Sequence, residues 1–276
     1  MSPAPGLSRQ RLAADRRRRL DRVAVVLDRL GERYDHPSWS SPRLDATAEL
    51  VLTILSQNTS DTNSARAFDR LRASYATWDA VLAAPTDELV DVIRPGGLAN
   101  VKAPRIQSVL AEVREATADA PFDLSFLASL PLAEAKAWLG GLPGIGPKTA
   151  AIVLLFTFGR PALPVDTHVF RVATRLGLLP SGTNVVRAHD ILEEALRPHE
   201  VYPFHVELIR HGREVCHARR PACEACPLSD VCVYYREVIT HSPQPAGKTR
   251  AGVGRGIPSD PAAWRAQLLH GALPPE

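Results

Sequence analysis

The four cysteines of this 276-residue chain lie within seventeen residues and leave no thiol elsewhere. They are Cys216, Cys223, Cys226 and Cys232, in the spacing C-x6-C-x2-C-x5-C. Four thiolates can bind a tetrahedral zinc ion or an iron-sulfur cubane, and structural zinc usually takes two short cysteine pairs. A single x2 pair between two longer loops favours a [4Fe-4S] cluster, with zinc and disulfides as the alternatives. A metal site of this kind would fix the fold of the segment around it.

The composition indicates a globular protein in a reducing compartment. Residues 1–20 contain no apolar segment of the kind that secretory signals have, so disulfides are not expected. With 45% hydrophobic residues the chain can bury a core, and no apolar run approaches membrane-spanning length. We therefore expect no membrane partner. The net charge of +3 permits a nucleic-acid partner without demanding one.

The hydrophobic pattern is helical almost throughout, and no alternating run indicates a strand, so the predicted fold class is all-α. The helical pattern is clear at residues 20–30, which follow the arginines 16–19, expected to be solvated. It is also clear at residues 48–55, which follow the N-cap candidate Asp45. A third helix should open at Thr86 and end at residues 95–97, and the wholly apolar segment 150–156 should be a buried helix. From residue 237 the chain is rich in Pro, Gly and Arg, which predicts a mobile tail with one short helix near 264–269.

Between two predicted helices lies the segment LPGIGPKTA, residues 142–150. Gly144 and Gly146 permit a tight turn, Ile145 between them should pack inward, and Pro147 suits the first position of the next helix. This pattern predicts a helix-hairpin-helix, whose free N–H groups at the helix start form an anion site that fits a DNA phosphate. A plain glycine turn between two helices is the alternative for this segment alone.

Lys148 stands in the first turn of that helix, where the positive end of the helix dipole disfavours a cation. It is one of only four lysines among 33 basic residues, with Lys102, Lys136 and Lys248. A partly desolvated, deprotonated amine there would be a nucleophile able to form a Schiff base with a sugar carbon; the alternative is a lysine that binds phosphate. Eighteen residues later Asp166 should cap a helix, and its carboxylate could also stabilise positive charge on a sugar ring.

The chain resembles the endonuclease III family of the helix-hairpin-helix DNA glycosylase superfamily, from about residue 20 to 236. The resemblance rests on the cysteine loop and on the segments LPGIGPKTA, VDTHVFRV, LSQNTSD, GLANVKA and HGREVC. It implies a two-domain all-α fold: a six-helix barrel with the hairpin at 40–160, and a [4Fe-4S] cluster domain at 161–236. The helix at 20–39 would pack with the cluster domain, 1–19 would be a basic extension, and 237–276 a flexible tail. DNA would lie across the groove between the domains.

The resemblance also implies an activity. Lys148 aligns with the catalytic nucleophile, and Asp166 with the catalytic carboxylate, of a bifunctional DNA glycosylase and AP lyase of base excision repair. Such an enzyme flips an oxidised pyrimidine out of the duplex, attacks C1′ through the lysine, and cuts the strand 3′ to the lesion by β-elimination. The implied partner is double-stranded DNA containing damaged pyrimidines or abasic sites. We expect a cytoplasmic monomer, associated with the nucleoid if the source is prokaryotic.

The family's DNA-contacting positions carry over to three parts of this chain. Leu98 is the apolar wedge candidate, and Gln57 or Asn58 would contact the orphaned base. Here the chain departs from the family: aligned on Asp61, Asn58 stands where a glutamine is usual, and Ala99 where many members have tyrosine. As alternatives, Leu98 could anchor its loop in the core, and Gln57 and Asn58 could be helix C-terminal caps. In the hairpin, the implied contacts are Leu142, Gly144, Ile145, Gly146 and Thr149.

The loop between the first two cysteines contains Arg219 and Arg220, which would reach phosphates unless they are simply solvated. His168 and His211, and with them Arg213, are expected to be structural. Two other functions compete with the leading one. A monofunctional enzyme of the adenine-glycosylase kind would lack the hairpin lysine and add a large C-terminal domain. A non-enzymatic iron-sulfur DNA-binding or electron-transfer protein would leave Lys148 and Asp166 unused.

Overall fold

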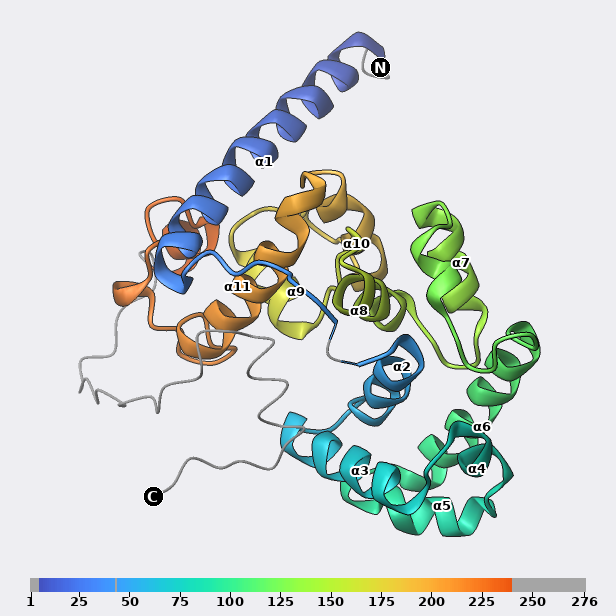
Figure 1. Cartoon of the computed structure of the whole chain (residues 1–276). Coiled ribbons are helices and arrows are strands. Elements are labelled where there is room, and N and C mark those ends of the chain that lie inside the picture. The colour runs from blue at the N-terminus through green and yellow to red at the C-terminus, as the bar shows by residue number, and fades with distance from the viewer. Residues whose placement is uncertain (1–4, 43, 240–276) are drawn as a thin grey trace. The chain divides into compact units, whose positions relative to one another are not determined.

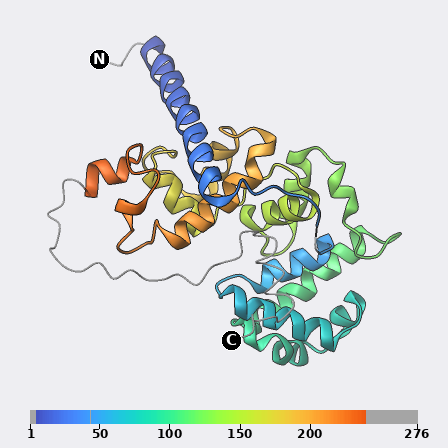
Figure 2. The same ribbon diagram turned by 60° about the vertical axis from the view of Figure 1, so that its left-hand side comes forward.

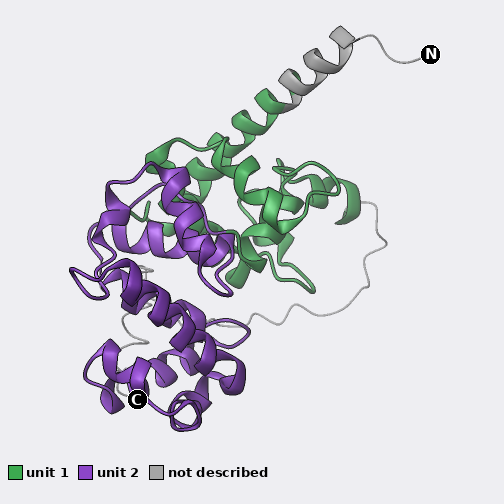
Figure 3. Ribbon diagram, turned by 90° about the vertical axis from the view of Figure 1, so that its right-hand side faces the viewer, with its two compact units in different colours: residues 1–38, 165–257 green, residues 39–164, 258–276 purple. Residues whose placement is uncertain are grey.

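The computed structural model describes residues 5–42 and 44–239, and every regular element in these ranges is helical (Figure 1). The predicted all-α fold class is confirmed. Two compact units make up the described chain, coloured separately in Figure 3: unit 1 comprises residues 5–38 and 165–239, and unit 2 comprises residues 39–42 and 44–164. The short helix expected near 264–269 lies outside the described residues. None of the helices described has the length and apolar character needed to cross a bilayer.

Unit 2 is organised around two helices that pack on each other, α2 (Ala46–Leu55) and α8 (Pro147–Phe158). All ten residues of α2 are buried, as are residues 149–155 of α8, which confirms the predicted buried helix. Each buried aliphatic side chain of this kind stabilises the fold by about 1.5–3 kcal/mol. The other elements are α3 (Asp61–Ser74), α4 (Trp78–Ala83), α5 (Thr86–Ile93), η1 (Arg94–Gly96), α6 (Ala99–Ala116), η2 (Ser125–Ala128) and α7 (Leu132–Gly141).

Local rules explain where the helices of unit 2 begin and end. The Asp45 carboxylate accepts a hydrogen bond from Ala48 N at 2.8 Å and caps α2, as predicted. Pro147 occupies the first position of α8, also as predicted. Thr86 opens α5, and the chain leaves the following η1 at Gly97, whose φ of +68° is a conformation that glycine adopts freely.

Unit 1 is built around α1 (Pro5–Tyr34) and α11 (Val201–Glu214), which pack against each other. Val23, Val26, Leu30 and Tyr34 form the buried stripe of α1, whereas Leu20 is 38% exposed. The helix begins well before that stripe, so the arginines 16–19 lie inside it and not at its start (Figure 2). The other elements are α9 (Thr167–Arg175), α10 (Val185–Glu193), η3 (Pro198–Glu200), η4 (Cys223–Ala225) and the π-helix η5 (Tyr235–Ile239).

Two arginines of α1 bind backbone carbonyl groups in distant segments of unit 1. Arg22 donates to the carbonyl oxygens of Leu176 and Gly177, each at 3.0 Å, directly after α9. Arg29 donates to the carbonyl oxygen of Pro227 at 3.0 Å and pairs with the carboxylate of Asp230. The N-terminal helix is therefore fastened to the cysteine loop although nearly two hundred residues separate them in sequence.

Candidate functional site

The segment between α7 and α8 forms the predicted hairpin. Gly144 has a φ of +71°, and the next N–H, that of Ile145, closes a turn on the carbonyl oxygen of Leu142 at 3.1 Å. Ile145 and Leu142 are each 5% exposed, so their side chains pack into unit 2 and hold the turn against the core. Thr149 is 5% exposed as well, so its side chain offers a ligand little surface. The helix-hairpin-helix prediction is confirmed.

The start of α8 has the properties of an anion site. Gly146 occupies the N-cap position and provides no side chain that could bond the first N–H groups of the helix. The 12-residue helix also directs the positive end of its dipole toward this point. Unsatisfied N–H groups and a positive dipole end together suit a phosphate group.

Lys148 is the second residue of α8, and its side chain is exposed. The expectation that Lys148 is partly desolvated is therefore wrong. The desolvated lysine of unit 2 is Lys102 in α6, which is 2% exposed. Burial, with a smaller effect of the neighbouring Arg105, lowers the pKa of Lys102 to about 8. An exposed amine on a helix N-terminus is accessible to an electrophile that approaches the hairpin.

The polar segment after α2 places its two candidate side chains differently. Gln57 is half-buried, and its Oε1 accepts a hydrogen bond from Nη1 of Arg105 at 2.7 Å. Asn58 is exposed and has a φ of +53°. The C-cap of α2 is Ser56, so neither residue has the capping role considered as an alternative. Asn58 is the more accessible of the two, and Gln57 is held by the protein.

Leu98 has the exposure expected of a wedge. It is 55% exposed, and it precedes α6 with a φ of +50°, which is rare for a leucine. The alternative that Leu98 anchors its loop in the core is wrong. A strained backbone that presents an apolar side chain to solvent is a feature that proteins retain mainly at functional positions.

Asp166 in unit 1 is the N-cap of α9, as predicted. Its Oδ1 accepts hydrogen bonds from the backbone N–H groups of His168 at 2.9 Å and Val169 at 2.7 Å. The preceding residue, Val165, donates its N–H to Nε2 of the buried His189 at 3.1 Å. The carboxylate is thus fixed by its own helix, and the backbone before it by a second helix, α10. His189 had no distinguishing sequence signal, because its partner is a backbone group.

The two histidines expected to be structural have structural contacts. His168 is half-buried, its Nδ1 lies 3.1 Å from Nη2 of Arg171, and burial lowers its pKa. His211 is 1% exposed, its Nε2 lies 3.5 Å from Sγ of Cys226, and burial lowers its pKa to about 4. Arg171 also donates to the carbonyl oxygens of Gly212 and Cys216. The lowered pKa values favour the neutral form of both imidazoles.

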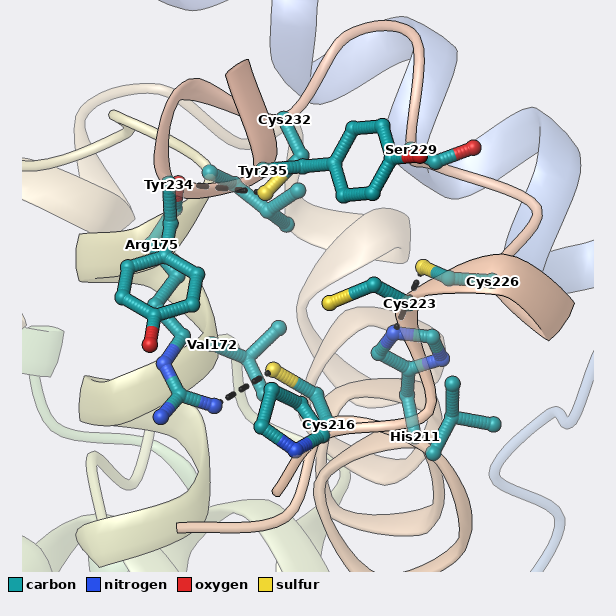
Figure 4. A pocket seen from close by; sticks show the side chains of 13 residues that line it. Val172, Arg175, His211, Cys216, Cys223, Cys226, Ser229, Cys232, Tyr234 and Tyr235 are labelled. Atoms are coloured by element: carbon teal, nitrogen blue, oxygen red, sulfur yellow. Dashed lines mark hydrogen bonds between the residues drawn. The ribbon is translucent and has the colours of Figure 1, made fainter. Parts of the chain in front are cut away.

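The four cysteines line one pocket in unit 1, with their sulfur atoms around it (Figure 4). In the described part of the chain, no three His, Cys, Asp or Glu side chains form a group arranged to hold a single metal ion. The remaining lining is largely apolar and includes Val172, Leu176 and Val215. Four thiols around an apolar pocket fit a [4Fe-4S] cluster. Burial raises the pKa of Cys226 to about 11, so ligation must displace its proton.

Arg175, the last residue of α9, organises the loop between the first two cysteines. Its Nη1 lies 3.2 Å from Sγ of Cys216 and donates to the carbonyl oxygen of His217 at 2.7 Å, while Nη2 donates to that of Ala218 at 3.0 Å. Arg219 and Arg220 follow directly and are exposed. The loop therefore presents two cations from a backbone that Arg175 holds.

Comparison with known families finds two matches along the chain. Residues 51–198 match the family described as "HhH-GPD superfamily base excision DNA repair protein". Residues 216–232 match the "Iron-sulfur binding domain of endonuclease III" and include all four cysteines. The first match covers the hairpin, Lys148 and Asp166, and the second covers the pocket.

Individual relatives extend these matches over most of the chain. The chain is 34% identical to "Endonuclease III" of Sulfolobus acidocaldarius over 70% of its own length and 83% of that protein. It is 31% identical to "Endonuclease III" of Escherichia coli over 77% of its length and 95% of that protein. Among solved structures, "Structure of a Trapped Endonuclease III-DNA Covalent Intermediate: Estranged-Adenine Complex" has a TM-score of 0.68 and 28% identity. That match covers 80% of this chain and 98% of the other.

Proposed function

This chain belongs to the endonuclease III family of base excision DNA repair proteins, and on that basis we propose a substrate class and a mechanism for it. It is a DNA glycosylase with a [4Fe-4S] cluster. The proposed substrates are oxidised pyrimidines in duplex DNA, and the proposed mechanism adds an AP lyase step through a Schiff base on Lys148. The observation that carries the proposal is the exposed amine of Lys148 at the second residue of α8, directly after the uncapped hairpin.

DNA binding begins with the phosphate backbone. The uncapped N–H groups at the start of α8 bind one phosphate, and Arg219 and Arg220 bind others. The cluster, when bound, cross-links the four cysteines and so keeps the arginine loop rigid. A base cannot be reached inside the stack, so the damaged nucleotide is flipped out, while Leu98 fills the vacated space and Asn58 contacts the orphaned base.

The chemistry starts from the neutral form of the Lys148 amine, because only that form has a free electron pair for attack. Its nitrogen attacks C1′, and the bond between C1′ and the base breaks with its electron pair leaving on the base, which takes up a proton. Asp166 stabilises the positive charge that develops on the sugar. Opening of the sugar ring then leaves a protonated Schiff base, which acidifies the 2′ position. Loss of a 2′ proton expels the 3′ phosphate and cuts the strand.

Borohydride trapping tests this function. Wild-type protein, Lys148→Ala, Asp166→Asn and a matched lysine control, Lys136→Ala, are incubated with duplex DNA containing an oxidised thymine or an abasic site. We expect covalent adducts with wild type and Lys136→Ala, none with Lys148→Ala, and slower base release with Asp166→Asn. Base release by the wild type without any adduct would favour a monofunctional glycosylase. Neither release nor adduct would favour a DNA-binding protein without glycosylase activity.

A further inference from the structure

Lys102, the first-turn lysine of α6, is buried where a charge is costly. It is 2% exposed, and two residues next to it, Leu55, whose carbonyl oxygen it contacts, and Ile106, one turn later in α6, belong to the buried core. Transfer of an ammonium group out of water is unfavourable unless hydrogen bonds replace its hydration. Nζ has two such bonds, to the carbonyl oxygens of Leu55 at 2.6 Å and Gly96 at 2.8 Å. A methionine or leucine would fill this space without that cost, so the two hydrogen bonds are what a lysine adds at this position.

Both acceptors are the last residues of helical elements. Leu55 ends α2 and Gly96 ends η1, so both carbonyls belong to the negative ends of their helices, where a cation is favourable. Gly96 lies so close to α2 that a Cβ on it would be 3.8 Å from the Leu55 carbonyl oxygen. One ammonium group can therefore join the end of α2 to the end of η1.

The segments that follow the two carbonyls are those proposed to enter the duplex. Gln57 and Asn58 come two and three residues after Leu55, and Leu98 comes two residues after Gly96. Asn58 and Leu98 both have positive φ values, of 53° and 50°, which persist only when the surrounding structure holds them. Lys102 bonds to the backbone just before each of these strained residues.

Arg105, one helical turn after Lys102, adds two further contacts. Its Nη1 donates to Oε1 of Gln57 at 2.7 Å. Its side chain also lies over the hairpin: a Cβ on Gly144 would be 2.8 Å from both Cδ and Cζ of Arg105. Lys102 and Arg105 thus contact the orphan-base segment, the wedge loop and the hairpin from a single helix.

We propose that Lys102 and Arg105 are positioning residues that fix the spacing between Asn58, Leu98 and the hairpin, so that the two side chains enter the duplex together. This inference rests on the proposed function, because Asn58, Leu98 and the hairpin are the parts of the chain that the proposed function brings into contact with DNA. Neither residue touches the reacting atoms. Lys148 can attack C1′ without Lys102 and Arg105, so only the reaction on substrates that require the wedge depends on these two residues.

The test compares Lys102→Met and Arg105→Met with Arg114→Met, which removes a half-buried arginine of the same helix that is paired with Asp79. Arg105 is only half-buried, so its variant folds even if the loss of Lys102 does not permit folding. Base release is measured on lesion-containing duplex, and trapping on a single-stranded abasic oligonucleotide that has no orphaned base. A 2-aminopurine opposite a stable abasic analogue in duplex DNA reports insertion of the side chains.

We expect both variants to lose the 2-aminopurine response and to release bases up to about 100-fold more slowly, as misplacement of groups away from the chemistry can do. Single-strand trapping should stay within about threefold of wild type, and Arg114→Met should behave as wild type in every assay. If trapping on single strands fell as much as base release on duplex DNA, the variants would have a general structural defect and the proposal would be overturned. An unchanged 2-aminopurine response would also overturn the proposal. If the wild type perturbs 2-aminopurine but traps nothing, the role of Lys148 fails and the positioning role stands.

Discussion

The two hairpin glycines are needed for different physical reasons, and replacing each with alanine separates those reasons. Gly144 has a φ of +71°, and a Cβ there would lie 2.8 Å from two atoms of Arg105. Gly146 has an extended backbone, with φ of −95° and ψ of 176°. Apart from its chain neighbours, no described atom lies within 4 Å of a Cβ built on Gly146. The protein itself therefore requires glycine at 144 and not at 146.

The expected magnitudes follow from this geometry. An alanine in the left-handed region costs about 1–2 kcal/mol, and Arg105 must also shift. Since each kcal/mol moves the Tm of a protein of this size by about 2–4 °C, Gly144→Ala should lower Tm by roughly 2–8 °C. Gly146→Ala should change stability by less than about 0.5 kcal/mol. Its methyl group would nevertheless hinder close approach of a phosphate, and we expect DNA binding to weaken about tenfold, or ~1.4 kcal/mol.

Thermal unfolding followed by circular dichroism gives the stabilities of both variants. Fluorescence anisotropy at one fixed salt concentration gives their affinities for a duplex with a stable abasic analogue, because phosphate contacts depend strongly on salt. The reasoning would be refuted if Gly146→Ala unfolded as early as Gly144→Ala. Wild-type affinity of Gly146→Ala would refute the phosphate site at the hairpin while leaving the account of Gly144 intact.

Three further predictions concern other parts of the molecule. Leu98→Gly should keep its stability, since glycine tolerates the positive φ, but it should release bases from duplex DNA at least about tenfold more slowly. The control Val101→Ala, which changes another exposed side chain, should release bases at the wild-type rate. Single-turnover kinetics measure both rates. Glu207 in α11 is 1% exposed, both of its carboxylate oxygens lack a partner among the described residues, and burial raises its pKa to about 8. Between about pH 4.5 and 8 the folded state therefore binds more protons than the unfolded chain, so the wild-type protein loses stability as the pH rises through that window. In urea unfolding, the stability of Glu207→Gln should rise relative to wild type by a few kcal/mol between pH 4.5 and pH 8. A stability difference that does not change with pH would contradict this. Arg175→Gln should lower the midpoint potential of the cluster by about 60 mV, if its bond to Cys216 is ~1.4 kcal/mol stronger in the reduced state than in the oxidised state. An unchanged potential in a spectroscopic redox titration would contradict this prediction.

Local sequence rules predicted the parts of the site that depend on neighbouring residues. The turn at Gly144, the proline at the start of α8 and the caps at Asp45 and Asp166 each depend on atoms within a few residues, so composition and spacing were enough to find them. The cysteine spacing was informative for the same reason. The early start of α1 was missed because the residues before its apolar stripe are helical by propensity and show no hydrophobic periodicity.

Features that depend on distant backbone atoms could not be predicted. Lys102 was one of four lysines singled out by the sequence, but its role depends on carbonyl groups 47 and 6 residues away. Arg175 bonds to a loop more than 40 residues ahead. Nothing in the sequence indicates that Leu98 has a positive φ, because leucine does not favour that conformation. The exposure of Lys148 likewise follows from packing around the hairpin and not from its place in a helix.

The central claim is that the nitrogen of Lys148 forms the covalent bond to the sugar. Its most direct test is peptide mapping by mass spectrometry of the adduct that wild-type protein forms with abasic DNA in the presence of borohydride. The account predicts a single modified peptide that contains the segment GPKTA, with the reduced sugar remnant on Lys148. An adduct on Lys102, on Lys136 or on the N-terminal amine would contradict it.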